Sequence, residues 1–241
     1  MNNRHFLLRA LKTISVPLAL SMSVSACVTL SAFGGTSWKE EVLLHDGGKI
    51  VVTRSVDRGG RHEIGQKPPY KEQSLGFAIP NTSQNVKWED HFSEDLGAAN
   101  FLPMLLDIHN GIAYLVVSPM GCLSYNKWGR PNPPYVIFKY EGKAWQRIPL
   151  TELPSEITAP NLISSSPDIE VEKSGKRFIS AEMIKQLNEG YKQPEYRSIL
   201  REKVEPGGVG SSVNCEEMIR YKCGWGSPGE FNKKYFENIC K

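Results

Sequence analysis

The dipeptide Asn110-Gly111 separates two strongly apolar stretches of the chain, and it constrains the fold more than any other feature. Residues 101–108 and 112–117 on either side of it are almost continuously apolar. A two-residue hairpin turn needs positive φ at both central positions, and Asn-Gly accepts this conformation readily. Apolar runs of this length are typical of strands that are buried on both faces. The sequence therefore predicts a buried antiparallel hairpin at residues 101–118.

Two further hairpins are expected, one on each side of this core. Residues 41–44 and 49–54 flank the turn residues Asp46-Gly47-Gly48, and residues 135–140 and 144–150 flank the turn Glu141-Gly142-Lys143. Glycine-containing turns between strand-like runs are the usual signal for a β-hairpin.

The rest of the first half of the chain is less regular. Residues 75–79 and 85–90 each have the pattern of a strand, whereas the polar segment 55–73 suggests an irregular loop or an edge strand. Residues 161–174 suggest a loop with at most one strand. We therefore expect residues 38–160 to be mainly β-structure.

Helix signals gather toward the C-terminus, in residues 161–241. Ser180 can cap a helix that ends before Gly190, and Pro194 can begin another that runs over 195–203. A terminal pair of helices is expected over residues 215–222 and 230–239. Strands first and helices afterwards predict an α+β fold, an antiparallel hairpin sheet followed by C-terminal helices.

The N-terminus has the composition of an export signal. Arg4, Arg9 and Lys12 make it basic, and the apolar run 14–22 that follows is shorter than the roughly 20 residues that span a bilayer. Residues 24–27 read Val-Ser-Ala-Cys. This pattern resembles the lipobox of bacterial lipoproteins, and the leader as a whole is similar to those of uncharacterised lipoproteins of Proteobacteria.

That resemblance implies where the mature chain begins and where it is located. Residues 1–26 are then a cleaved signal peptide, and Cys27 carries acyl chains such as palmitate on its thiol and amine. Two or more acyl chains anchor a protein stably in a membrane. Because Val28 and not Asp follows Cys27, the resemblance implies the outer membrane, facing the periplasm. Residues 27–37 are expected to be a tether, and residues 38–241 a single α+β domain.

The charge balance excludes a nucleic-acid partner. Three of the 29 basic residues belong to the leader, so the mature chain has 26 basic and 26 acidic residues. Nucleic-acid-binding domains are usually basic.

The four cysteines other than Cys27 are expected to form two disulfides, because an exported chain folds in an oxidising compartment. Cys-x-x-Cys pairs and His-rich clusters that would indicate zinc are absent from the sequence. Three pairings are open. A helix over 215–222 would separate Cys215 and Cys223 by about 12 Å, too far for a bond. An antiparallel helical hairpin then favours Cys215–Cys240, with Cys122–Cys223 as the second bridge.

No catalytic motif, metal site or cofactor site is evident. Among the histidines, His45 and His109 lie beside predicted turns, and His62 and His91 lie in polar segments. Asp107 and His109 would share one face of a strand, as a base with its orienting acid does. Only their meeting with another histidine or acid around one open cleft would favour an enzyme.

The segment 121–135 is the most unusual in composition. It combines aromatic residues, arginine, asparagine and prolines between two strong strands. Rigid loops of this kind can present an interaction surface, although such a loop can equally be a connection whose tryptophan covers the core. The candidate binding residues are Tyr125, Asn126, Trp128, Arg130 and Tyr135.

Two functional hypotheses follow. The first is a non-enzymatic, lipid-anchored envelope protein that binds a partner, in a layout of signal, tether and domain that is similar to lipoproteins that neutralise secreted toxins. The second is an envelope hydrolase that acts on peptidoglycan, glycan or lipid. We favour the first, because the sequence contains no catalytic motif.

Overall fold

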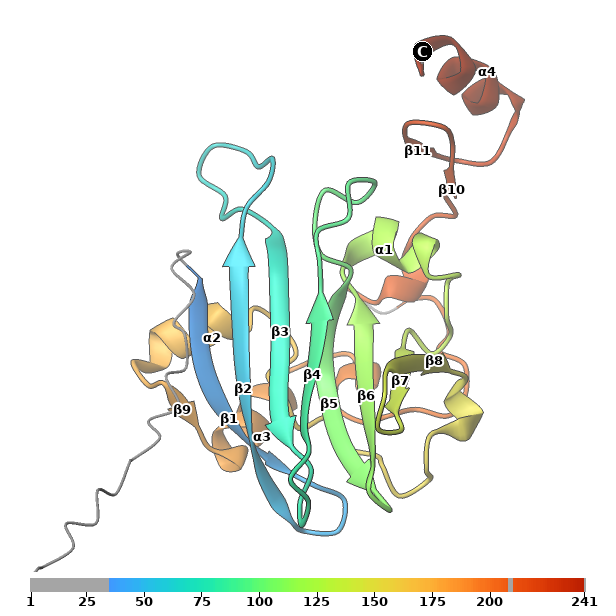
Figure 1. The fold of residues 1–241 in the computed structure, drawn as a ribbon. Coiled ribbons are helices and arrows are strands. Elements are labelled where there is room, and N and C mark those ends of the chain that lie inside the picture. The colour runs from blue at the N-terminus through green and yellow to red at the C-terminus, as the bar shows by residue number, and fades with distance from the viewer. Residues whose placement is uncertain (1–34, 208–209, 241) are drawn as a thin grey trace, which may run out of the picture. The chain divides into compact units, whose positions relative to one another are not determined.

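The computed structural model describes residues 35–207 and 210–240, and antiparallel hairpins form the frame of this part of the chain (Figure 1). The predicted leader and Cys27 lie outside the described residues. The described residues fall within one compact unit. Its fold is α+β, as predicted, with strands before the C-terminal helices.

The first sheet has five strands in the order β4-β3-β2-β1-β9. Its main strands pair antiparallel with one another: β1 (Thr36–Leu43), β2 (Lys49–Arg58), β3 (Tyr70–Ala78) and β4 (Asn85–Asp90). The short β9 (Phe178–Ile179) pairs parallel with β1. Strand β1 begins at Thr36, within the segment predicted as a tether. Residues 55–73 are not a single loop, because β2 and β3 both extend into this segment.

The second sheet has four antiparallel strands in the order β5-β6-β7-β8. The Asn110-Gly111 turn joins β5 (Phe101–His109) to β6 (Ile112–Pro119), and both residues have positive φ, as the hairpin prediction requires. Almost every residue of these two strands is buried. Strands β7 (Val136–Tyr140) and β8 (Trp145–Ile148) form the third predicted hairpin.

The two sheets share a hydrophobic core. Side chains from both sheets, among them Val52, Leu75, Leu106 and Leu115, belong to one buried cluster. Burial of such side chains supplies the main stabilisation of the fold. The first sheet alternates buried and exposed positions, as in β2, whereas β5 and β6 are covered on both faces.

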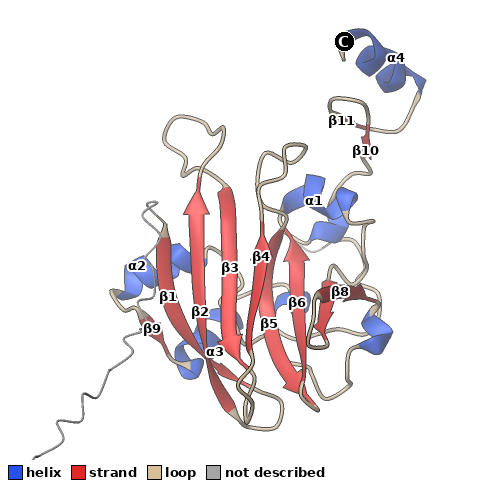
Figure 2. Ribbon diagram, viewed as in Figure 1, coloured by secondary structure: helices blue, strands red, loops and turns tan. Residues whose placement is uncertain are grey.

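Helices cover part of the first sheet near β1 (Figure 2). Helix α3 (Ala181–Glu189) begins at the predicted cap, where Ser180 Oγ accepts a hydrogen bond from Met183 N, 3.4 Å away. Helix α2 (Pro167–Ser174) lies in the segment predicted as loop or strand. The predicted helix over 195–203 is wrong, because only the short 3₁₀ turn η2 (Pro194–Tyr196) forms there. Two other 3₁₀ turns, η1 (Leu150–Glu152) and η3 (Ser212–Asn214), join neighbouring elements.

The C-terminal segment corrects the helical-hairpin prediction. Residues 215–222 are not helical, and two short strands, β10 (Ile219–Arg220) and β11 (Trp225–Gly226), pair instead. Only the second predicted helix forms, as α4 (Glu230–Ile239). The acid-first, base-last pattern of 215–222 is outweighed by tertiary hydrogen bonds, which hold residues 215–218 against helix α1 (Gly121–Lys127).

The four cysteines other than Cys27 all form disulfides, but the predicted pairing is wrong. The bonds are Cys122–Cys215 and Cys223–Cys240, with Cα–Cα distances of 5.3 and 5.5 Å. Without a helix at 215–222, Cys215 lies beside α1 and Cys223 lies between β10 and β11. Helix α4 packs on this hairpin, where Phe236 stacks on Tyr221 with ring centroids 4.8 Å apart. That packing brings Cys240 to Cys223.

No helix in residues 35–207 and 210–240 is long and apolar enough to span a bilayer.

Candidate functional site

A histidine from the β1–β2 turn meets a buried aspartate of the second sheet. His45 Nδ1 lies 2.6 Å from Asp107 Oδ1, and the backbone N–H of His45 donates to Oδ2 over 2.9 Å. Asp107 is only 3% exposed, and its Oδ1 also accepts from Ile108 N. Because a carboxylate accepts hydrogen bonds, the proton of the imidazole is held on Nδ1. Asp107 therefore fixes both the position and the tautomer of His45.

The free side of this imidazole is available to a ligand. None of the described residues forms a hydrogen bond with His45 Nε2, and the His45 side chain is 17% exposed. The hydrogen bond to Asp107 raises the pKa of His45 above its usual value of 6.5, although partial burial opposes the shift. His45 can thus present either a lone pair or, once protonated, an N–H donor near neutral pH.

Two more titratable side chains lie next to this pair. The rings of His45 and His109 have centroids 5.2 Å apart. The two histidines lower the pKa of Glu156, after the larger effects of its own backbone N–H and Ser155. The sequence predicted that Asp107 and His109 could act together. In the structure the hydrogen-bond partner of Asp107 is His45, and His109 lies beside that pair.

An open cleft of about 680 Å³ lies in front of His45. Its walls are the β1–β2 turn, the segment 156–161 and helix α3, and its lining includes His45, Asp107 and Glu156. The condition stated above for an enzyme was that Asp107 and His109 meet another histidine or acid at one cleft, and it is met only in part: Asp107, His45 and Glu156 line this cleft, but His109 is not among its lining residues. His109 adjoins the cleft through His45.

A buried amide group also lines the cleft. Asn188 of α3 is 4% exposed, and its Nδ2 donates to Leu162 O over 2.9 Å, but its Oδ1 has no hydrogen-bond partner in the structure. Such an unpaired buried acceptor costs free energy until a donor reaches it. The other buried side chains with an unpaired polar atom among the described residues, Glu195 and Ser211, do not line the cleft.

Charged side chains of both signs surround the cleft, and most of them are paired. Lys49 Nζ lies 3.1 Å from Glu41 Oε2, and Lys185 Nζ lies 3.8 Å from Glu189 Oε1.

Three charged residues of the cleft lack such a partner. Glu156, Glu182 and Arg197 line it without an ion pair to any described residue. When each pair is counted as neutral, these three leave a surplus of one negative charge at the cleft.

The aromatic side chains of the predicted binding loop pack against the rest of the protein. Tyr125 is 2% exposed and Tyr135 is 5% exposed. Trp128 is half-buried, with its ring 4.5 Å from Phe101 between centroids. These aromatic side chains cover the core, as expected if the segment is a connection between strands.

The two polar residues of that loop hold the C-terminal segment in place. Arg130 donates to Cys215 O and Glu216 O, and Asn126 donates to Glu216 O and accepts from Met218 N. Together with the Cys122–Cys215 bond, these contacts fasten the segment after η3 to α1. The five candidate residues therefore do not form an exposed interaction surface.

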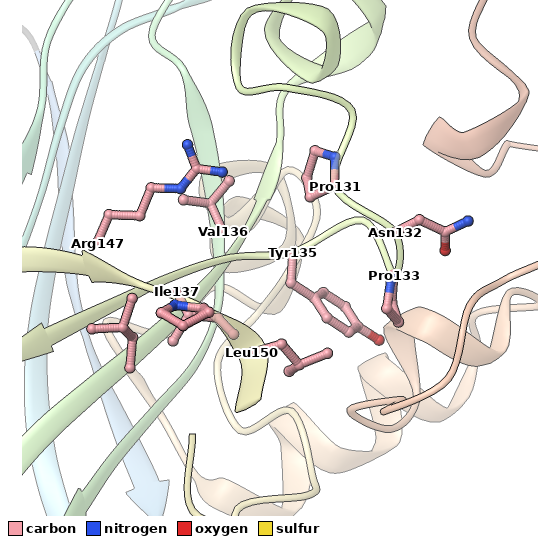
Figure 3. Close-up of a pocket in the computed structure, with 10 residues that line it drawn as sticks. Pro131, Asn132, Pro133, Tyr135, Val136, Ile137, Arg147 and Leu150 are labelled. Carbon is pink, nitrogen blue, oxygen red and sulfur yellow. The ribbon is translucent and has the colours of Figure 1, made fainter. Parts of the chain in front are cut away.

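A second hollow, of about 410 Å³, lies beside this loop (Figure 3). Figure 3 shows the Tyr135 ring close to Pro133 and Leu150. The Tyr135 hydroxyl is already engaged, since it donates to Glu195 O over 2.8 Å. Arg147 is the one charged side chain in the lining, so this hollow has no group of titratable side chains comparable to that of the His45 cleft.

The other two histidines in the described part of the chain, His62 and His91, do not line the cleft. His62 Nδ1 lies 3.0 Å from Gly60 O, and His91 forms an exposed pair with Glu72. Among the residues that the structure describes, no three His, Cys, Asp or Glu side chains are arranged to hold a metal ion.

Sequence reasoning missed His45 because its partner is 62 residues away. The turn at Asp46-Gly47-Gly48 predicted only that a polar residue would be found there. No family of proteins matches this chain, and neither a curated protein nor a solved structure matches it.

Proposed function

We propose that this chain is a lipid-anchored protein of the bacterial cell envelope, whose folded part binds a partner molecule in the His45 cleft. The anchoring rests on the basic, apolar and Val-Ser-Ala-Cys parts of the leader, with Cys27 as the acylated residue. The outer membrane, on its periplasmic side, is the proposed location. Such a role includes that of an immunity-like protein, which binds a protein partner.

One observation carries the binding role. The cleft of about 680 Å³ is lined by His45 and Asn188, whose Nε2 and Oδ1 atoms have no hydrogen-bond partner among the described residues. Ligand sites are typically concave, with apolar walls and a few well-placed polar groups. Leu44, Pro160 and Ile184 supply apolar wall here.

Anchoring is tested by the substitution Cys27→Ser. The variant should leave the membrane fraction, or remain there only as uncleaved precursor, because the acyl acceptor is gone. Mass spectrometry of the native protein should find acyl chains on Cys27. An unmodified N-terminal residue, or an unchanged membrane fraction for the variant, would contradict the proposal.

Binding in the cleft is tested by chemical cross-linking of the native lipoprotein in membranes, followed by purification under denaturing conditions. A partner that depends on the cleft should be lost from a His45→Gln, Glu182→Gln double variant. The matched control is His62→Gln, Glu237→Gln, which makes the same chemical changes outside the cleft. Equal recovery of the same partners with both variants would contradict the proposed role of the cleft.

The His45–Asp107 pair supports a second candidate, an acid–base hydrolase of the envelope. In that case Asp107 holds the proton on Nδ1, and Nε2 takes a proton from an attacking water or hydroxyl. Wild-type protein would be assayed on peptidoglycan, glycan and lipid-ester substrates. His45→Gln should then reduce turnover by roughly 10²-fold or more, with His62→Gln unchanged. Absence of turnover by the wild-type protein on all three classes removes this candidate.

A further inference from the structure

The unpaired groups of the His45 cleft indicate which chemistry its ligand presents. We propose that the cleft receives an ammonium group, either on a basic side chain of a polypeptide or on a free amine. This inference rests on the proposed binding role of the cleft and adds the chemical class of the ligand.

The first argument is the unpaired oxygen of Asn188. Its Nδ2 is engaged by Leu162 O, so Oδ1 is the atom left without a partner, on a residue that is 4% exposed. A carboxamide oxygen only accepts hydrogen bonds. A ligand that brings a donor to this position would satisfy the oxygen, and an ammonium group has three donors and no acceptor.

The second argument is the charge that remains after pairing. Lys49, Lys185 and His45 each lie against an acidic side chain, which neutralises them as local charges. The carboxylates of Glu156 and Glu182 lack such a partner among the described residues. Arg197 lines the same cleft, and His109 and His45 have a minor electrostatic effect on Glu156. A cation entering the cleft therefore meets more unpaired negative than positive charge, and partial exclusion of water strengthens that attraction.

The third argument is the apolar part of the wall. Leu44, Pro160 and Ile184 line the same cleft. Leu44 is 6% exposed and Ile184 is 1% exposed. A methylene chain that carries an ammonium group can lie along such a surface while its charged end reaches the oxygen atoms. A cleft lined by glutamates but without apolar side chains would not favour a ligand that combines a methylene chain with a charged end.

The test compares three capped amino acids of similar size on the folded, full-length lipoprotein in detergent. The probes are the N-acetyl N′-methylamides of lysine, norleucine and glutamate. Binding is followed by chemical shifts of the Asn188 side-chain amide and the Ala181 backbone amide, which both belong to the cleft lining. The lysine probe should bind most tightly, and its affinity should fall as the salt concentration rises.

Two variants and one control locate the interaction. Asn188→Ala should weaken binding of the lysine probe roughly ten- to a hundredfold, because a buried hydrogen bond to a charged group is lost. Glu182→Gln, on the exposed side of α3, should weaken it about two- to fivefold without affecting folding. Glu237→Gln, which removes the same charge from α4, should leave the affinity unchanged.

Each alternative result has a definite meaning. Equal affinity for the norleucine probe would show that the apolar wall alone binds, and tighter binding of glutamate would show recognition of an anion by Arg197 or protonated His45. Either result, or binding of none of the probes, overturns the ammonium inference. Free amines are distinguished by adding butylammonium, which should compete only if no peptide group is needed. The binding role of the cleft itself fails separately, in the cross-linking experiment above.

The same experiment has an internal control. The chemical shift of the Tyr135 backbone amide reports on the second hollow, which Tyr135 lines. It should not change with any probe. A change there with the lysine probe, and none at Asn188, would place the ammonium group elsewhere and would also overturn the inference.

Discussion

Two acid–base pairs of this molecule differ in how accessible they are to a ligand. In the core, Glu40 accepts from Trp38 Nε1, Arg54 Nη1 and Ile163 N at 2.7–3.1 Å, and Arg54 also donates to Ile163 O. Both side chains are almost inaccessible, at 0 and 3% exposure. At the cleft, Asp107 is equally engaged, but one ring nitrogen of His45 is not.

This difference separates a structural role from a functional one. The Glu40–Arg54 pair holds β1, β2 and the segment at Ile163 together, and both side chains are too deeply buried to meet a ligand. In the Asp107–His45 pair, Asp107 holds the imidazole in place, and Nε2 of the partly exposed His45 has no hydrogen-bond partner among the described residues. Such a pair fixes a reactive group at a surface. Perturbed titratable groups at a cleft are candidates for function for this reason.

The largest expected effect is that of removing Glu40. Glu40→Ala leaves Arg54 as an unpaired buried charge, which should lower the free energy of unfolding by about 3–5 kcal/mol. Urea denaturation measures it. The control is Glu89→Ala, because the Lys87–Glu89 pair is exposed and should cost no more than about 1 kcal/mol. Similar losses for both variants would mean that burial does not distinguish these pairs.

The next effect in size is that of Asp107→Asn. The amide can accept only one of the two hydrogen bonds from His45, so we expect a loss of about 1–3 kcal/mol in the free energy of unfolding. The pKa of His45, measured by NMR, should fall toward 6.5, because the first cause of its increase is removed. If His45 kept its raised pKa in this variant, the assignment of Asp107 as its partner would be wrong.

A smaller effect is expected for the pH dependence of stability. The folded state raises the pKa of His45, so protonation favours folding. This contribution is fully present below the unfolded pKa of about 6.5 and is lost as the pH rises through the raised folded value. His45→Gln removes it. The difference in unfolding free energy between wild type and variant should therefore decrease from pH 6 toward pH 9. A constant difference over that range would contradict the linkage.

The smallest expected effect is that of Glu156→Gln. Glu156 adds only a minor electrostatic contribution to the raised pKa of His45, so the variant should lower that pKa slightly. Stability should change little, as for most surface substitutions. Glu237→Gln, outside the cleft, should leave the pKa of His45 unaltered. A large loss of stability with Glu156→Gln would show that Glu156 has a structural role like that of Glu40. It would contradict the distinction between the buried pair and the residues of the cleft.

Local patterns predicted the hairpins and two of the helices, α3 and α4. The Asn110-Gly111 turn, the turn at Asp46-Gly47-Gly48 and the Ser180 cap each act over a few residues, and the elements beside them form where expected. Segment 215–222 shows the limit of such patterns. Its helix-like charge order is overruled by hydrogen bonds from Asn126 and Arg130, about 90 residues earlier in the chain.

The sequence by itself determined the α+β order, the buried central hairpin and the participation of four cysteines in disulfides, because these follow from local turn chemistry, hydrophobic pattern and number of thiols. Only the tertiary structure decided which cysteines pair, which loop is buried and where the candidate site lies. The physical reason is distance along the chain: His45 and Asp107, like Cys122 and Cys215, meet through packing of separate elements. No local propensity encodes such a meeting.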